Sequence, residues 1–308
     1  MNIHKISIFF HIIIVFSIGF IPDVSYAKHD LDKNPVNFKL IKDYANLASA
    51  AYKTSSNLKK TKFLNNYSLT HYNAIDELGI SYFLITNDKT RNQSIAIRGT
   101  SNIENTMANL SVKLTFDNHT GIYLHQGYLL IAQAIYSELK DYIKKDYTIN
   151  ATGHSMGGAV ALILAMALDK DKVKIGEIVT FGQPKITNLA GAYKFQHLNI
   201  TRVVTPKDLI PLVPLIDPMD INDLDIYWHQ GKEILLLPGS RYSVLEGLSS
   251  MLRATRFTQE MLNEDNILNH QMRHYQAMLN KKIPDSKLVP YKNDFNLFNL
   301  FSEKSSTK

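Results

Sequence analysis

The sequence contains no cysteine, and it has only one tryptophan among its 308 residues. The absence of cysteine excludes disulfide frameworks, zinc–thiolate sites, cysteine nucleophiles and lipid anchors attached to cysteine. A strong excess of either charge is also missing, because 34 Lys and Arg stand against 28 Asp and Glu, a formal net charge of +6. The basic residues are scattered, which argues against binding of nucleic acid as the function.

No internal repeat of roughly 20–50 residues and no long Gly-, Ser- or Pro-rich linker divides the chain. With 45% hydrophobic and 20% charged residues, the composition is that of a globular chain that can bury a full core. We therefore expect one main domain at residues 28–280. A targeting segment precedes it, and a basic tail at residues 281–308 follows it and carries six Lys.

Residues 1–27 have the pattern of a secretory signal peptide. Lys5 precedes an apolar run at residues 6–21, and Ser25 and Ala27 supply small residues three and one positions before a cleavage point. The run is short for a membrane span, which needs about 20 apolar residues. We expect cleavage after Ala27 and a secreted or periplasmic protein that is held by its core alone. An uncleaved membrane anchor is the alternative.

Apolar residues at helical spacing alternate with short β-branched and aromatic runs along the main domain. The pattern predicts helices at residues 38–52, 128–143, 156–168 and 267–279, and strands at residues 80–86, 94–97, 147–151, 177–181 and 200–204. The polar turn between the first two strands makes them a hairpin. Strands that alternate with helices indicate an α/β fold, which has a mostly parallel central sheet and helices on both faces.

Between the strand expected at residues 147–151 and the helix expected at residues 156–168 stands Gly153-His154-Ser155-Met156-Gly157. In this setting a G-x-S-x-G motif exposes a nucleophilic serine above the sheet, and glycines flank it because the tight turn leaves no room for Cβ atoms. The backbone N–H of Met156, at the start of the helix, then points to where an oxyanion would form. Ser155 is therefore the candidate nucleophile, and Met156 a candidate oxyanion donor.

A nucleophilic serine needs a general base, and the base needs a carboxylate that fixes its tautomer. Asp208 follows the strand expected at residues 200–204, at the edge of the sheet where catalytic loops lie. The alternative is a turn aspartate of the kind that often follows a proline. Position alone favours neither interpretation.

Four histidines follow the serine, and spacing alone does not choose the base among them. His197 precedes Asp208, which breaks the usual chain order, and His229 lies in a segment typical of a strand that enters a hairpin. His270 and His274 are four residues apart on the helix expected at residues 267–279, so they share a face. No third ligand accompanies them, which argues against a zinc site.

Six segments, in order along the chain, resemble the class 3 (fungal-type) lipase family of α/β-hydrolases. They are Ile97-Arg98-Gly99-Thr100, His125-Gln126-Gly127-Tyr128, the serine motif, residues 180–185 with Asn188, residues 203–208 with Pro211 and Pro214, and residues 270–275. The resemblance covers roughly residues 80–279 and implies an α/β-hydrolase fold. It implies a catalytic triad of Ser155, Asp208 and His270. His274 stays the alternative base, and Thr100 stands where the family has its second oxyanion donor.

The resemblance implies an exported serine ester hydrolase of the triacylglycerol lipase type, which cleaves lipid esters through an acyl-enzyme and needs no cofactor or metal. A phospholipase A1 or another acyl-ester esterase would use the same triad, and a non-catalytic lipid-binding relative is the alternative outside the enzymes. The expected partner is a lipid ester at a lipid–water interface. The modest positive charge favours peripheral contact with anionic lipid surfaces, and the sequence leaves the oligomeric state open.

The segment after Thr100 bears on that substrate. Residues 101–104 form an S-x-x-E capping box, and the apolar residues that follow, up to Leu114, fall on one helical stripe. We expect a short helical lid at residues 101–114, with a helix that permanently faces the core as the alternative. Arg98, just before the segment, is expected in a structural ion pair rather than on a substrate anion. The acidic stretch at residues 217–225 lacks the glycine and the terminal glutamate of an EF-hand, so we expect a solvated loop there.

Overall fold

The computed structural model describes residues 36–61, 64–75, 79–100, 113–214, 226–254 and 264–291. The expected signal peptide, the acidic stretch at residues 217–225 and residues 101–112 of the expected lid lie outside the described residues. Leu114, at the end of the expected lid, is the first residue of a strand, so the helical stripe does not extend to it.

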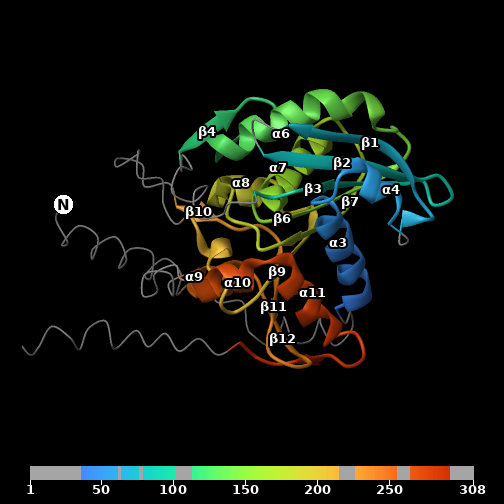
Figure 1. The fold of residues 1–308 in the computed structure, drawn as a ribbon. Helices are drawn as coiled ribbons and strands as arrows, with labels where there is room; N and C mark the ends of the chain where they lie inside the picture. Colours follow the sequence, from blue (N-terminus) through green and yellow to red (C-terminus); the bar gives the residue numbers. More distant parts are fainter. Residues whose placement is uncertain are drawn as a thin grey trace, which may run out of the picture. The chain divides into compact units, whose positions relative to one another are not determined.

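A nine-stranded sheet forms the centre of the fold. Its strands are Ser68–Ile75 (β1), Ile80–Asn87 (β2), Asn92–Ile97 (β3), Thr148–His154 (β6), Ile175–Phe181 (β7), Asn199–Val204 (β9), Lys232–Leu236 (β11), Arg241–Leu245 (β12) and Lys287–Leu288 (β13). They lie in the order β1-β2-β3-β6-β7-β9-β11-β12-β13 (Figure 1). The strands from β3 to β11 pair in parallel, whereas β1, β2 and β3 pair antiparallel, as do β11 and β12. The expected mostly parallel sheet and its β2–β3 hairpin are confirmed.

Helices cover both faces of the sheet, as expected (Figure 1). On one face lie α6 (Gln126–Leu139) and α7 (Met156–Lys170), and on the other lie α3 (Phe38–Ala50) and α11 (Met272–Asn280). Every residue of α7 from Met156 to Leu168 is buried, which is why this helix is apolar on all sides rather than along one stripe. On the opposite face, the Gln276 side-chain amide donates to Asn46 Oδ1 over 3.2 Å and joins α11 to α3.

A second sheet of four strands stands beside the central one, and the sequence patterns do not predict it. Its strands are Leu114–Asp117 (β4), Ile122–His125 (β5), Thr187–Asn188 (β8) and Tyr227–Trp228 (β10), in the order β10-β8-β5-β4. The rings of Phe116 and Tyr123 meet across β4 and β5 with centroids 5.3 Å apart, and both remain about half exposed. Helix α8 (Leu189–Lys194) is tied to this sheet by Lys194 Nζ, which donates to the Gly121 carbonyl over 2.9 Å.

The chain continues in the central sheet beyond residue 280, where the basic tail is expected to begin. β13 pairs in parallel with β12, and the buried Lys282 donates through Nζ to the carbonyl of Leu237 over 2.6 Å. Residues 281–291 therefore contribute to the folded body, and residues 292–308 lie outside the described part of the chain.

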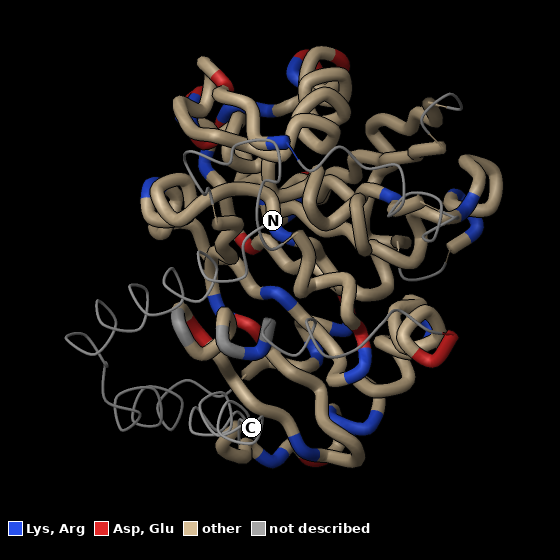
Figure 2. Tube along the Cα trace, turned by 90° about the vertical axis from the view of Figure 1, so that its left-hand side faces the viewer, with Lys and Arg blue, Asp and Glu red and all other residues tan. Residues whose placement is uncertain are grey.

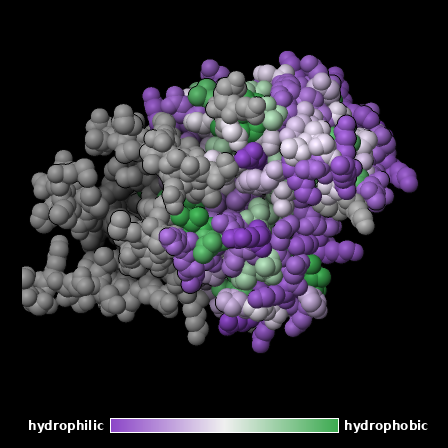
Figure 3. All heavy atoms as spheres, in the orientation of Figure 1, coloured by the Kyte–Doolittle hydropathy of each residue, from purple (hydrophilic) through white to green (hydrophobic). Residues whose placement is uncertain are grey.

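Basic and acidic residues are both spread along the described chain. Lys and Arg occur along much of the chain trace, interspersed with Asp and Glu (Figure 2). On the face seen in Figure 3, hydrophilic side chains predominate and hydrophobic ones form small separate patches. Among the residues that the structure describes, no helix combines the length and the apolar character that crossing a membrane requires.

Candidate active site

Ser155 occupies a strained turn between β6 and α7. Its φ of 56° and ψ of −131° lie in a region that side-chain-bearing residues rarely adopt. A Cβ on Gly153 would come within 2.3 Å of the Gly157 carbonyl oxygen, and one on Gly157 within 2.3 Å of the Ile97 carbonyl oxygen. The backbones of β3, β6 and α7 therefore touch at this turn, and only glycine at both positions allows it. The contact holds Ser155, which is 4% exposed, at the carboxyl edge of the sheet.

The two expected oxyanion donors belong to segments that adjoin this serine. Gly99 packs directly against it, because a Cβ on Gly99 would be 3.0 Å from Ser155 Cβ and 2.5 Å from the His154 carbonyl oxygen. Thr100 is the next residue along the chain. Met156 is the first residue of α7, where backbone N–H groups have no partner within the helix. The structure thus brings the Gly99–Thr100 segment and the start of α7 to Ser155.

Asp208 and His270 form a fully buried pair. His270 Nδ1 lies 2.8 Å from Asp208 Oδ2, and since a carboxylate only accepts, Nδ1 carries the hydrogen. The Tyr275 hydroxyl donates to the same carboxylate oxygen, and the N–H of Ile210 donates to the other over 2.9 Å. Burial alone would raise the pKa of Asp208, but the charge of His270 and these hydrogen bonds hold the pKa below its ordinary value. The carboxylate is therefore ionised and oriented.

The pair and the serine meet at Gly182. A Cβ on Gly182 would lie 2.8 Å from His270 Cε1 and 2.9 Å from Asp208 Oδ2, so the pair rests on its backbone. The preceding residue, Phe181, accepts the Ser155 N–H over 2.8 Å. Among the described residues, His270 Nε2 is buried and has no hydrogen-bond partner, so the base position of the ring is unoccupied by other protein groups.

The expected single helix at residues 267–279 is wrong. The chain forms α10 (Glu264–His270) and α11, separated by Gln271, whose ψ of 139° is extended. The His270 carbonyl, which would accept from the His274 N–H in a continuous helix, accepts instead from His154, and the His274 N–H bonds to Gln271. His270 and His274 consequently do not share a helix face. Of these two histidines, only His270 hydrogen-bonds to Asp208 in the described structure.

Two other residues that the sequence suggested, His229 and Arg98, make contacts away from the reacting atoms. His229 Nε2 donates to the Pro211 carbonyl over 2.6 Å and so holds the loop that follows Asp208. The Arg98 guanidinium lies over the ring of Tyr52, 5.5 Å from the centroid, and the described residues form no ion pair with it.

Sequence reasoning gave no role to three residues that complete the site, namely Tyr52, Gly182 and Tyr275. Tyr275 is the last residue of the family segment at residues 270–275, and Gly182 lies in the segment at residues 180–185. The family motifs could therefore have identified both residues. Tyr52 follows α3 in chain order and stands in no motif, and only the fold reveals it.

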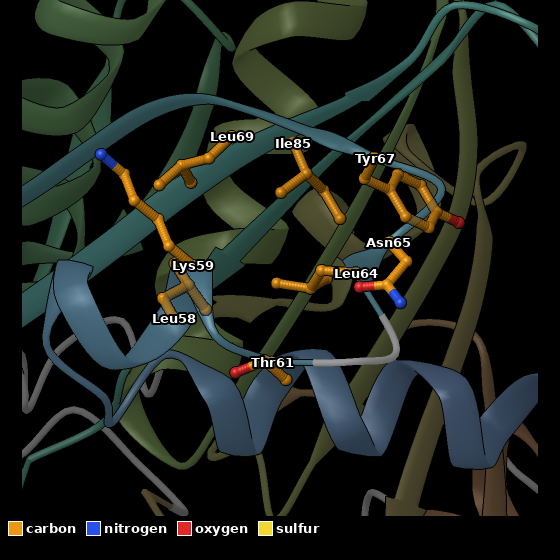
Figure 4. A pocket seen from close by; sticks show the side chains of 8 residues that line it. All are labelled: Leu58, Lys59, Thr61, Leu64, Asn65, Tyr67, Leu69 and Ile85. Atoms are coloured by element: carbon orange, nitrogen blue, oxygen red, sulfur yellow. The ribbon is translucent and has the colours of Figure 1, made fainter.

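A cavity of about 350 Å³ lies away from these residues, against α4 (Ser55–Lys59) and the β1–β2 hairpin. It is lined by Leu58, Lys59, Thr61, Leu64, Asn65, Tyr67, Leu69 and Ile85 (Figure 4). None of the expected site residues lines it. No group of three or more His, Asp or Glu that would hold a metal ion occurs among the described residues.

The family model for Lipase (class 3) matches residues 94–217. A lipase of Rhizomucor miehei is 30% identical over 140 residues, which are 41% of this chain and 39% of that lipase. The secreted mono- and diacylglycerol lipase 1 of Fusarium solani is 29% identical over 117 residues, which are 36% of this chain and 35% of that protein.

Among solved structures, lipase II from Rhizopus niveus superposes with a TM-score of 0.54 at 21% identity, covering 66% of this chain and 81% of its own. The chain therefore has the α/β-hydrolase fold that the resemblance implies. It spans little more than a third of the length of the two curated relatives named above.

Proposed function

Because the chain belongs to the class 3 lipase family of α/β-hydrolases, we propose that it is a serine hydrolase that cleaves the carboxylic esters of lipids. The observation that carries the proposal is the buried Asp208–His270 pair, with its 2.8 Å hydrogen bond, beside a serine in a strained strand-to-helix turn. An ionised carboxylate that fixes the tautomer of a neighbouring imidazole is what activation of a serine requires.

In the proposed reaction, Ser155 Oγ attacks the ester carbonyl while His270 Nε2 takes its proton. His270 then passes the proton to the leaving alcohol, and Asp208 stabilises the imidazolium through Nδ1–H. The backbone N–H groups of Met156 and Thr100 stabilise the oxyanion. Water then repeats the cycle on the acyl-enzyme and releases the fatty acid.

The proposed substrate class is the glycerol ester of fatty acids at a lipid–water interface. Two relatives support this choice: the Fusarium solani protein is a mono- and diacylglycerol lipase, and the Rhizomucor miehei protein is a lipase. We further propose that the chain is exported after cleavage behind Ala27 and that the segment between Thr100 and β4 acts as a lid. An N-terminus at Met1 in the exported protein would contradict cleavage. A rate on emulsified long-chain esters that rises no more steeply than on soluble short-chain esters would contradict the lid.

The test of the reaction is ester release from triacylglycerol, monoacylglycerol, phospholipid and short-chain esters by wild type and by Ser155→Ala. We expect kcat to fall by about 10⁶ in this variant, because the triad acts as one unit. Ser137→Ala, on the exposed surface of α6, is the matched control and keeps wild-type activity.

A fluorophosphonate probe supplies the second measurement, and we expect it to label Ser155 alone. Faster release from phospholipid than from triacylglycerol would reassign the substrate to that of a phospholipase A1. Unchanged hydrolysis in Ser155→Ala would end the proposal, and absence of both labelling and release would favour a lipid-binding protein.

A further inference from the structure

Behind the serine, Tyr52 and His154 link two backbone segments of the site through hydrogen bonds. His154 Nε2 lies 2.6 Å from the carbonyl oxygen of His270, and its Nδ1 lies 2.7 Å from the hydroxyl of Tyr52. A carbonyl oxygen only accepts, so Nε2 carries the hydrogen of the neutral ring. Nδ1 is then the acceptor, and the Tyr52 hydroxyl is its donor.

The phenol oxygen of Tyr52 has a second contact, with the Gly99 backbone, and lies 3.0 Å from where a Cβ on Gly99 would stand. It accepts a hydrogen bond from the backbone N–H of Gly99. Gly99 precedes Thr100, whose N–H is the proposed oxyanion donor. The hydrogen bonds therefore run without a break from the oxyanion segment, through Tyr52 and His154, to the backbone of His270.

Both side chains are uncharged at neutral pH. Burial lowers the pKa of His154 to about 3, with a further contribution from the charge of His270. Tyr52 is 36% exposed as a whole, but desolvation of its hydroxyl raises its pKa to about 12. A neutral imidazole between a hydroxyl donor and a carbonyl acceptor has one favourable tautomer, so the direction of both hydrogen bonds is fixed throughout the pH range in which an ester hydrolase works.

The surroundings of the two side chains add to their rigidity. The His154 ring packs against the His270 ring with centroids 4.5 Å apart, and against the Tyr275 ring at 6.1 Å. Arg98 lies over the Tyr52 ring and restricts its movement. His154 is 3% exposed, so water does not compete for its two nitrogen atoms.

We propose that Tyr52 and His154 are positioning residues, which fix the distance between the oxyanion segment at Gly99–Thr100 and the base His270. The inference rests on the proposed function, because it assigns a role relative to that triad. Neither residue touches the substrate in this role. The serine reacts only when the base and the oxyanion donors are in place together. Loss of the Tyr52–His154 hydrogen bonds therefore lowers the rate of the chemical step rather than the affinity for the substrate.

The main test is Tyr52→Phe, which removes one oxygen atom and keeps the ring under Arg98. The variant leaves the Gly99 N–H and His154 Nδ1 without their partner. The oxyanion segment and the base then lose the link that fixes their distance, and a misplacement of about 1 Å costs up to about 100-fold in rate, so we expect kcat to fall roughly 10- to 100-fold while KM stays within about twofold. The matched control is Tyr44→Phe. It removes a hydroxyl from a largely buried tyrosine of α3 that takes no part in the Tyr52–His154 hydrogen bonds, so it should keep wild-type kcat.

His154 offers a rescue experiment that a purely structural role does not predict. His154→Gln keeps an amide N–H that can reach the His270 carbonyl, whereas His154→Leu does not. We expect the glutamine variant to retain at least about tenfold more kcat than the leucine variant at equal thermal stability, since each tenfold corresponds to about 1.4 kcal/mol. The Tyr52→Phe and His154→Gln effects should be less than multiplicative in the double variant, because both interrupt one chain.

The outcomes separate this inference from the proposed function. If Ser155→Ala is inactive but Tyr52→Phe has wild-type kcat, or if it changes KM alone, the positioning role is wrong and the function stands. If Ser155→Ala keeps its activity, the proposed function fails first, and with it the role of Tyr52. A loss of kcat in Tyr44→Phe equal to that in Tyr52→Phe would also overturn the inference.

Discussion

Gly182→Ala tests the geometry of the candidate site more directly than removal of a reacting group. Gly182 has a φ of +58°, and a Cβ there would lie 2.8 Å from His270 Cε1. Ordinary contact begins at 3.4 Å, so the histidine or the strand must move by about 0.6 Å. A displacement of about 1 Å in a catalytic group costs up to about 100-fold in rate. We therefore expect kcat to fall roughly 10- to 100-fold.

The chain offers a matched control for the backbone strain. Gly239 has a φ of +70° and nothing within 4 Å of an added Cβ. Alanine in the left-handed region costs about 1–2 kcal/mol at either position, and overpacking at Gly182 adds about 1–3 kcal/mol. Gly239→Ala should thus lose stability and keep kcat, while Gly182→Ala loses both.

The assay combines denaturant unfolding with kcat and the rate of fluorophosphonate labelling for the two variants. Labelling needs the serine and its base but no substrate-specific groove, so it reports the geometry of the pair. If Gly182→Ala labels at the wild-type rate and unfolds at the same midpoint as Gly239→Ala, then Gly182 does not support the Asp208–His270 pair.

Two further predictions concern the buried charges beside the Asp208 loop. Glu233 binds Arg202 over 3.0 Å and Arg253 over 2.5 Å, so Glu233→Gln should lower the free energy of unfolding by about 3–5 kcal/mol. The control is Glu246→Gln at an exposed position, which should change the free energy of unfolding by less than about 0.5 kcal/mol. Equal denaturation midpoints for the two variants would contradict the buried pairing. Burial, with the charges of these arginines, lowers the pKa of Lys185 to about 7 from 10.5, so folding releases a proton between these pH values. The wild type should therefore gain stability relative to Lys185→Met from pH 7 to pH 9 in denaturant titrations, and parallel curves would disprove the shift.

The parts of the fold that could be predicted from the sequence are those with strong local patterns. β2 and β3 contain β-branched and aromatic or aliphatic runs, and α7 is an apolar helix that begins within a G-x-S-x-G motif, so period and turn chemistry identify them. β8 and β10 have two residues each, which is too short for any period. The break at Gln271 has no local signal either, because it depends on where the His270 carbonyl finds its partner, 116 residues away.

The candidate site shows the same division. Ser155 could be identified from its own neighbours in the chain, since strand, turn and helix are contiguous. Asp208 and His270 are 62 residues apart, and spacing alone left four histidines open until the family resemblance chose one. Tyr52 lies 102 residues from His154, and neither residue type nor position marks it in advance. Its contact arises because the segment that follows α3 reaches the end of β6.

The two sides of the site are fixed by different physical means, and this decides how each responds to change. The nucleophile side depends on glycines whose missing Cβ atoms let three backbones touch, so any added atom acts through sterics. The acid side depends on donors aimed at the Asp208 loop: Tyr275 and Ile210 on the carboxylate, and Lys185 on the carbonyls of residues 212 and 214. Substitution there acts through hydrogen bonding and charge. The Tyr52–His154 chain joins the two sides, which is why its loss should affect the rate without an effect on binding.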